Sequence, residues 1–182
     1  LRHPVGGRIR GDRMTISTVG LLPEIRRYTR EGHPYRLILS LTSAFDEKRS
    51  RLMPIGRTWS VAELAEAMTH HARSRRDLVH LAWVLMAGEN TGPEEAREIR
   101  RLFPDMPLRV HVIDVNDPSG RYRRAGDAER SAFLGALAEQ RISFVRRYSG
   151  GADIHAACGM LASLARGGEA HAPASPLAGG QA

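Results

Sequence analysis

The feature that most constrains the fold of this chain is a regular alternation of short apolar runs with longer amphipathic segments. Five runs are typical of β-strands, at 14–18, 36–41, 79–86, 108–115 and 142–147. Helices are predicted at 21–31, 60–75, 93–103, 127–140 and 153–165, and 46–52 is read as a short helix or a charged turn. Strands that alternate with helices in this way form right-handed βαβ units and a parallel sheet. The sequence therefore predicts an α/β fold.

Local signals support the predicted helix boundaries. Gly32 follows the first helix and is a typical stop. Ser60 and Glu63 have the spacing of a capping box, in which each side chain accepts a hydrogen bond from the backbone of the other. Acidic residues that follow Pro93, including Glu95, lie near the positive end of the next helix.

Chain length limits the architecture. A complete eight-unit parallel barrel takes about 250 residues, whereas this chain has 182. We therefore expect an incomplete parallel (β/α) barrel or an open sheet, with strands that are apolar on both faces. Residues 1–11 are expected to be irregular, residues 12–166 to form the partial barrel, and the Gly-, Ala- and Pro-rich residues 167–182 to be disordered. The sequence contains neither a dinucleotide-binding fingerprint nor a P-loop.

The chain is strongly basic, with a formal net charge of +7, and Lys48 is its only lysine. Guanidinium groups bind phosphate and carboxylate oxygens bidentately, so nucleic acid is a candidate partner. The candidates for RNA contacts are Arg121, Arg123, Arg124, Arg146 and Arg147, with Tyr122 and Tyr148 next to them. The alternative is a solvated basic loop and strand edge. A high genomic GC content would explain arginine in place of lysine, but not the excess of positive charge.

Cys158 is the only cysteine of the chain. It can form no internal disulfide, and one thiol cannot supply the ligands of an iron–sulfur cluster. A chain without disulfides fits a reducing compartment, so a cytoplasmic location is expected. No apolar run approaches the roughly 20 residues that span a bilayer, so no membrane partner is expected. The oligomeric state is not indicated.

Polar residues follow three of the predicted strands at the point where each ends. Ser17 ends the first strand, Ser40 and Thr42 end the second, and Asn116 follows the fourth. In α/β barrels the functional groups gather at the carboxyl ends of the strands, so these residues predict a polar mouth for a small ligand. The alternative is ordinary turn chemistry, because short polar side chains also satisfy loop backbone groups.

Other conspicuous residues favour structural roles. His70 and His71 are adjacent on a predicted helix, where neighbouring side chains point about 100° apart, so they are expected at the surface and not at a metal. Trp59 and Trp83 are expected to be core or staple residues. We assign no metal site.

Five segments carry a more specific pattern. They are MTISTVGLLPEIRR at 14–27, LSLTSAFDEKRSRLMPIGR at 39–57, VLMAGENTGPEEAREI at 84–99, VIDVNDPSGRYRR at 112–124 and VRRYSGGADIHAACGMLA at 145–162. In this order and spacing, from Asp12 to about Ala165, they resemble the radical-SAM rRNA adenine methyltransferases, the RlmN/Cfr family. The resemblance implies a radical-SAM barrel, of which this chain would be the C-terminal part.

The resemblance implies a set of residues that bind S-adenosylmethionine. Ser17 looks like the strand-end serine that contacts this cofactor, and Asn116 matches the asparagine that also binds it. Ser40, Leu41 and Thr42 fall on the family's Ser-Leu-His ligand-binding triplet. Thr42 departs from the pattern, because it replaces the histidine.

Cys158 matches the thiol that, in the family, accepts a methyl group and carries its carbon to RNA. The amidine carbons of adenine are electrophilic and cannot attack a sulfonium, whereas a thiolate can. The family mechanism therefore methylates the cysteine first. A deoxyadenosyl radical then removes hydrogen from that methyl group, the carbon radical adds to the adenine, and a second cysteine resolves the bond between protein and RNA.

Several elements of the family are missing from this chain. They are the Cys-x3-Cys-x2-Cys motif that holds a 4Fe–4S cluster, the resolving cysteine, the Gly-Met-Gly-Glu-Pro strand and the N-terminal RNA-binding domain. The chain is expected to be a fragment of an RNA adenine methyltransferase, with large-subunit rRNA as the expected substrate and tRNA as a second candidate. Two alternatives stay open. One is a diverged radical-SAM enzyme on another substrate, suggested by Thr42 and by Asp114 where the family usually has proline. The other is a non-catalytic remnant or binding module.

Overall fold

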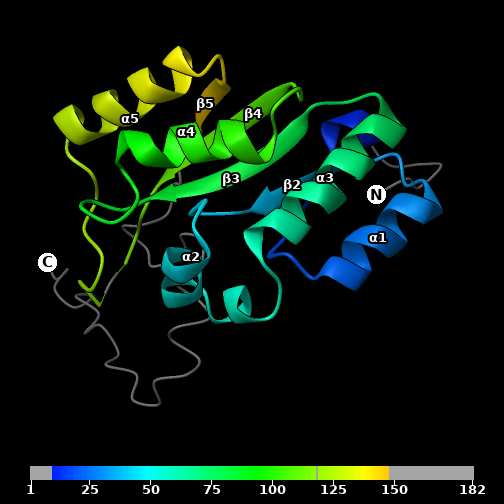
Figure 1. The fold of residues 1–182 in the computed structure, drawn as a ribbon, viewed down its shortest axis with the longest axis horizontal. Helices are drawn as coiled ribbons and strands as arrows, with labels where there is room; N and C mark the ends of the chain where they lie inside the picture. Colours follow the sequence, from blue (N-terminus) through cyan, green and yellow to red (C-terminus); the bar gives the residue numbers. More distant parts are fainter. Residues whose placement is uncertain (1–9, 118, 148–182) are drawn as a thin grey trace, which may run out of the picture.

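The structure is a computed structural model that describes residues 10–117 and 119–147. Five strands form one sheet, with five α-helices between them along this part of the chain (Figure 1). The strands are β1 (Thr15–Thr18), β2 (Arg36–Ser40), β3 (Val79–Leu85), β4 (Leu108–Asp114) and β5 (Ser143–Arg147). The helices are α1 (Leu22–Glu31), α2 (Asp46–Leu52), α3 (Val61–Arg75), α4 (Pro93–Leu102) and α5 (Asp127–Glu139), with 3-10 turns at Gly11–Arg13 and Pro54–Arg57.

All neighbouring strands are parallel, and their order in the sheet is their order along the chain. The longest ladder joins β3 to β4, from Val79 opposite Leu108 to Leu85 opposite Asp114. Because every strand runs in the same direction, all five carboxyl ends lie along one edge of the sheet, which we call the carboxyl edge. The predicted α/β fold is confirmed, and the sequential parallel order is that of a partial (β/α) barrel.

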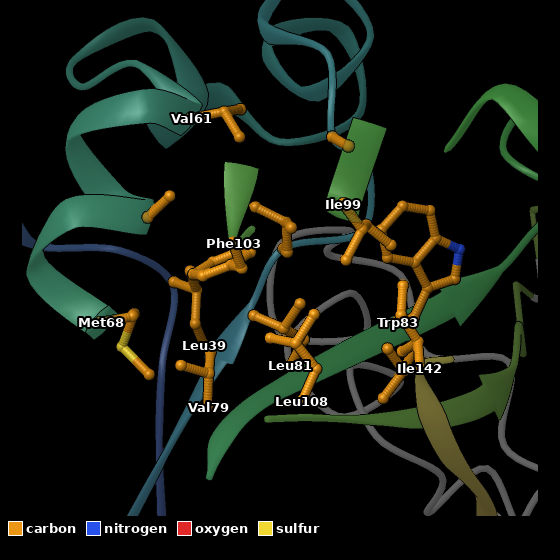
Figure 2. Close-up of a cluster of buried hydrophobic side chains, with 14 of the residues drawn as sticks. Leu39, Val61, Met68, Val79, Leu81, Trp83, Ile99, Phe103, Leu108 and Ile142 are labelled. Atoms are coloured by element: carbon orange, nitrogen blue, oxygen red, sulfur yellow. The ribbon is translucent and has the colours of Figure 1, made fainter. Parts of the chain in front are cut away.

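Helices α1, α3, α4 and α5 pack on one face of the sheet and bury a single hydrophobic core (Figure 2). The strands contribute alternate residues to this core, such as Leu81 and Trp83 of β3 and Val110 of β4, because successive side chains of a strand point to opposite faces. Trp83 is fully buried and stacks on Phe133 of α5, with 5.4 Å between the ring centroids. The core role predicted for Trp83 is confirmed, and Trp59 packs partly buried against the same cluster.

The predicted helix signals operate as expected. The Ser60 hydroxyl accepts a hydrogen bond from the Glu63 backbone N–H, and the Glu63 carboxylate accepts one from the Ser60 N–H, so the capping box is formed. Gly32 ends α1 with φ 65°, in the left-handed region that favours glycine. Across the predicted elements that the structure describes, the boundaries differ from the expected ones by one residue at most.

The opposite face of the sheet, which we call the open face, differs from expectation. It carries His80 of β3 with Arg109 and His111 of β4, and Ser17 and Ser40 lie toward its carboxyl edge. The expectation that the strands are apolar on both faces is therefore wrong at these positions. The signal was present in VHLAWVL and LRVHVID, where the histidines occupy the positions that alternate with core residues.

At one side of the sheet, β1 pairs only with β2 within the described residues. Three large apolar side chains in and just after β1 are exposed: Ile16 and Val19 by 43% each and Leu21 by 39%. The described residues contain no helix that is both long and apolar enough to cross a membrane. The predicted helix at 153–165, the tail at 167–182 and most of the N-terminal segment lie outside these residues.

The stacked pair of Trp83 and Phe133 makes the core sensitive to truncation. Replacing Phe133 with alanine should lower the free energy of unfolding by about 3–5 kcal/mol, because the change removes buried apolar surface and leaves a cavity beside Trp83. Urea unfolding measured by tryptophan fluorescence checks this. The matched control is Phe144→Ala, since Phe144 is 39% exposed and should cost far less. Equal losses for the two variants would contradict the assignment of the core.

Candidate functional site

The hydroxyls of Ser17 and Ser40 meet at the carboxyl edge. Ser17 lies opposite Ile38 in the parallel register of β1 and β2, so Ser40, two residues further along β2, points from the same face. The two Oγ atoms are 3.3 Å apart, and either can donate the hydrogen bond between them. Ser17 is exposed and Ser40 half-buried, so the pair can exchange its mutual bond for bonds to a ligand.

Asn116 follows the end of β4 at the same edge. Its side-chain Oδ1 accepts a hydrogen bond of 2.9 Å from Arg124 Nη2. Its Nδ2 is buried and has no hydrogen-bond partner among the described residues. A buried amide donor without a partner is costly, so this atom is a candidate for ligand binding.

The chain turns sharply immediately after Ser40. Leu41 is fully buried in the core, so a ligand can reach only its backbone. The Ser43 N–H donates to the Leu41 carbonyl at 2.8 Å and closes a three-residue turn around Thr42. Thr42 is buried and has φ 64°, a conformation that costs a β-branched residue roughly 1–2 kcal/mol. Thr42, which the sequence resemblance places on the family's histidine, is therefore held in a strained position.

Two buried polar side chains that the sequence analysis did not assign to the site anchor this turn. Asn90 and Glu95 are both fully buried. The Asn90 amide donates to the Thr42 carbonyl at 2.7 Å, while the Glu95 carboxylate accepts hydrogen bonds from the Ser43 hydroxyl at 3.0 Å and the Ala44 N–H at 2.8 Å. One argument could have indicated such residues from the sequence: the backbone groups of a buried strand and a buried turn need hydrogen-bond partners.

Arg49 of α2 holds the loop that follows β1. Its side chain is 1% exposed, and its Nη2 donates to the Val19 carbonyl at 2.6 Å. Burial lowers the pKa of Arg49, and the nearby Asp46 carboxylate opposes this effect. Gly20 lies against the guanidinium with φ 101°, and a Cβ there would come within 3.0 Å of Nη2. Arg49 thereby fixes the backbone that immediately follows the Ser17 strand end.

Three of the five arginines predicted to contact RNA lie in the loop between β4 and α5. Arg121, Arg123 and Arg124 are exposed. The Arg121 guanidinium lies 5.1 Å from the centroid of the Tyr122 ring, and Arg124 is bound to Asn116. This loop therefore presents positive charge beside the asparagine at the carboxyl edge.

The other two arginines point to opposite faces of β5. Arg146 Nη2 lies 3.8 Å from an Asp114 oxygen, and Asp114 also pairs with Arg130 at 3.9 Å. Arg147 faces the open face, where its Nε donates to His111 Nδ1 at 2.9 Å. Asp114, which the sequence resemblance places where the family usually has proline, thus makes two ion pairs that proline could not form.

His80 and His111 form a buried chain of hydrogen bonds on the open face. Because Arg147 can only donate, His111 Nδ1 must accept, so neutral His111 carries its proton on Nε2 and donates to His80 Nδ1 at 3.1 Å. His80 then directs its own N–H toward Asp77, whose oxygen is 3.7 Å away. Burial lowers the pKa of His111 to about 4, with the Arg147 charge adding to the effect. Burial also lowers the pKa of His80, although Asp77 opposes it.

The prediction that His70 and His71 are both surface residues is wrong for His71. Its side chain is 6% exposed and its Nδ1 lies 2.9 Å from the Thr29 hydroxyl of α1. Burial lowers the pKa of His71. The two histidines point apart, as expected for adjacent helical positions, and α1 covers the second.

Cys158 lies outside the described residues, so the structure does not place it relative to the serines and Asn116. Within residues 10–117 and 119–147, no three His, Cys, Asp or Glu side chains are grouped so that they could hold a metal ion. The site that the structure brings together is therefore the carboxyl edge, from Ser17 and Ser40 to Asn116.

A parallel half-barrel with polar groups along its carboxyl edge agrees with the comparisons to known proteins. No family model matches the chain. It is 50% identical over 168 residues to a probable RNA methyltransferase of Anaeromyxobacter sp. (strain Fw109-5), covering 91% of this chain and 50% of that protein. It is 38% identical over 167 residues to the dual-specificity RNA methyltransferase RlmN of Sorangium cellulosum (strain So ce56), covering 90% and 43% respectively.

A solved structure agrees with these relatives. The crystal structure of a radical SAM methyltransferase from Sphaerobacter thermophilus superimposes with a TM-score of 0.78 at 33% identity, covering 83% of this chain and 45% of that one. The fold is thus that of part of a radical SAM methyltransferase. The chain is a relative of the RlmN-type RNA methyltransferases and spans about half the length of the curated relatives it matches.

The buried histidine pair predicts a loss of stability in acid. The folded pKa of His111 is about 4, below the value of about 6.5 for an unfolded chain. The unfolded state therefore binds the proton first as the pH falls below about 6.5, and stability decreases until about pH 4. The loss attributable to this group is about 3 kcal/mol.

A His111→Gln variant should lose correspondingly less stability over the same pH range, as measured by urea unfolding at each pH. His70→Gln, on the exposed outer side of α3, is the matched control and should follow the parent chain. An unchanged pH dependence in His111→Gln would show that the pair is not held neutral.

Proposed function

We propose that this chain forms the S-adenosylmethionine-binding part of an RNA adenine methyltransferase. The observation that carries the proposal is the convergence of the Ser17 and Ser40 hydroxyls, 3.3 Å apart, at the carboxyl edge. Asn116 follows β4 at the same edge, and its Nδ2 has no hydrogen-bond partner among the described residues. The relatives named as RNA methyltransferases support the same reading. The chain matches about half the length of these relatives, so we propose the methyltransferase activity for a longer protein of which this chain is a part.

The residues at the edge fit S-adenosylmethionine. This ligand carries ribose hydroxyls, an ammonium and a carboxylate, which need short hydrogen-bonding groups of both polarities. Ser17 and Ser40 can donate or accept, and the buried Asn116 Nδ2 is a donor without a partner in the part of the chain that the structure describes. Thr42 completes the proposed set, and Leu41 contributes its backbone. When bound, the cofactor supplies a methyl group activated by a sulfonium.

The residues of the chain do not fit an iron–sulfur cluster. A cluster bound by Cys-x3-Cys-x2-Cys needs three thiolates, and the chain has one cysteine. The radical step of the family is therefore not assigned to any residue of this chain.

Cys158 is proposed as the residue that accepts the methyl group. Its thiolate would attack the methyl carbon, forming a new carbon–sulfur bond as the bond to the sulfonium breaks. The products are S-methylcysteine and S-adenosylhomocysteine, and the charges of thiolate and sulfonium cancel. The thiol proton must leave first, so the reaction depends on the thiolate fraction.

RNA is the proposed substrate, with large-subunit rRNA first and tRNA second, in the cytoplasm. Arg121 and Arg123 offer exposed guanidinium groups for phosphates, and Arg124 connects this basic loop to Asn116. Arg146 and Arg147 are also proposed as contacts, although binding RNA would compete with their bonds to Asp114 and His111.

Binding of S-adenosylhomocysteine to the purified chain tests the cofactor site. Each of Ser17→Ala and Asn116→Ala should weaken binding measured by calorimetry by about five- to thirty-fold, since each removes about 1–2 kcal/mol of hydrogen bonding to the ligand. Ser131→Ala removes a hydroxyl from an exposed position of α5 and should bind as the parent chain does. Equal affinity in all variants would contradict the proposed site.

Methyl transfer to Cys158 is tested separately with S-adenosylmethionine labelled in its methyl group. We expect label on the peptide that contains Cys158, and no label in Cys158→Ala, because no other thiol exists in the chain. Peptide mass spectrometry locates the added carbon. Label retained in the alanine variant, or found on another residue, would contradict the carrier role.

A further inference from the structure

The turn after Ser40 depends on one buried side chain from a distant part of the sequence. We propose that Asn90 is a positioning residue, which holds residues 40–42 in place at the carboxyl edge through the Thr42 carbonyl. This inference rests on the proposed function, because it concerns the triplet assigned to S-adenosylmethionine. Asn90 itself is fully buried and would not touch the ligand.

Asn90 uses its whole amide to join three backbone groups. Its Nδ2 donates to the Thr42 carbonyl at 2.7 Å and to the Val84 carbonyl at 2.8 Å. Its Oδ1 accepts from the Met86 N–H at 2.8 Å. Val84 lies at the end of β3 and Met86 immediately follows it, whereas Thr42 belongs to the turn after β2. The amide thus joins the two neighbouring strand ends.

The position of this bridge is where the backbone ladder stops. The β2–β3 register ends with Ser40 opposite Ala82, and the last backbone bond runs from the Leu41 N–H to the Ala82 carbonyl at 3.1 Å. Beyond this point β2 turns away, and its Thr42 carbonyl would lose its partner in β3. The side-chain amide of Asn90 replaces the missing ladder bond.

The strain at Thr42 explains why the turn needs such a bond. With φ 64°, Thr42 occupies a region that β-branched residues rarely adopt, and such conformations persist only where surrounding contacts determine them. Within the described residues, Glu95 holds Ser43 and Ala44, which follow Thr42, but makes no hydrogen bond to Thr42 itself. Asn90 is therefore the side chain that fixes the position of the Thr42 carbonyl.

The three bonds require an amide, which provides two donors and an acceptor on one short side chain. Aspartate has almost the same shape, but its carboxylate would face two carbonyl oxygens. When protonated, it recovers one donor and one acceptor. An Asn90→Asp variant should therefore disturb the turn at high pH and restore it partly at low pH, because burial beside carbonyls raises the pKa of an acid.

The experiment compares the unchanged chain with Asn90→Asp and with Gln140→Glu, a matched amide-to-acid change at the end of α5. Calorimetry gives the Kd for S-adenosylhomocysteine at about pH 8 and about pH 5.5. At the higher pH we expect Asn90→Asp to bind at least about ten-fold more weakly than the parent, and at the lower pH the ratio should shrink. Gln140→Glu should match the parent at both.

Amide NMR spectra of the same proteins without ligand give an independent measurement. In Asn90→Asp the shifts that change with pH should be concentrated in residues 41–44 and 84–86. Equal affinity of Asn90→Asp and parent at both pH values would overturn the positioning role. An equal loss at both pH values, with shifts spread across the sheet, would also overturn it, since that is the result of general destabilisation.

Failure of the proposed function would look different. If the parent chain binds no S-adenosylhomocysteine, the cofactor assignment falls, and the pH-dependent shifts of residues 41–44 alone decide whether Asn90 holds the turn. If Asn90→Asp does not fold at the higher pH, Asn90→Ser replaces it, because the smaller side chain leaves room for a bridging water. Unchanged shifts in residues 41–44 of that variant would refute the inference.

Discussion

The common direction of the strands is the constraint on which the rest of the structure depends. With β1 to β5 parallel and in sequential order, each helix must return the chain along one face, and every strand must end at the same edge. The core of Trp83, Phe133 and their neighbours holds that arrangement from the helical side. For this reason Ser17 and Asn116, which are far apart in the sequence, lie at the same edge. The parallel topology alone is sufficient to place them there.

Local sequence patterns were sufficient to predict most of the helices and strands, because capping and stop residues mark where these elements begin and end. The capping box of Ser60 and Glu63 and the glycine stop at residue 32 fixed helix ends that the structure reproduces. The Ser17–Ser40 pair also follows from strand ends and a parallel register. Sequence patterns failed where burial depends on a neighbour, as for His71, which α1 covers.

The supporting residues of the site could not have been predicted in the same way. Asn90 lies in a segment typical of a turn, and its importance depends on the end of a ladder between two other strands. A glutamate such as Glu95 is common in the first turn of a helix, so its sequence position gives no sign of a special role. Only the structure shows that its carboxylate is buried against Ser43 and Ala44. Hydrogen bonds between residues about 50 positions apart leave no periodic signal in the chain.

The partners of β1 have a consequence for how this chain behaves on its own. Within the described residues one side of β1 has no neighbouring strand, and Ile16, Val19 and Leu21 are exposed beside it. Unpaired backbone donors and acceptors next to apolar side chains are a template for adding another strand. Two copies that meet along this row would each satisfy the other's peptide groups, so the exposed side of β1 favours self-association in solution. The fraction of associated chains would then rise with protein concentration, in spite of the net positive charge that opposes association.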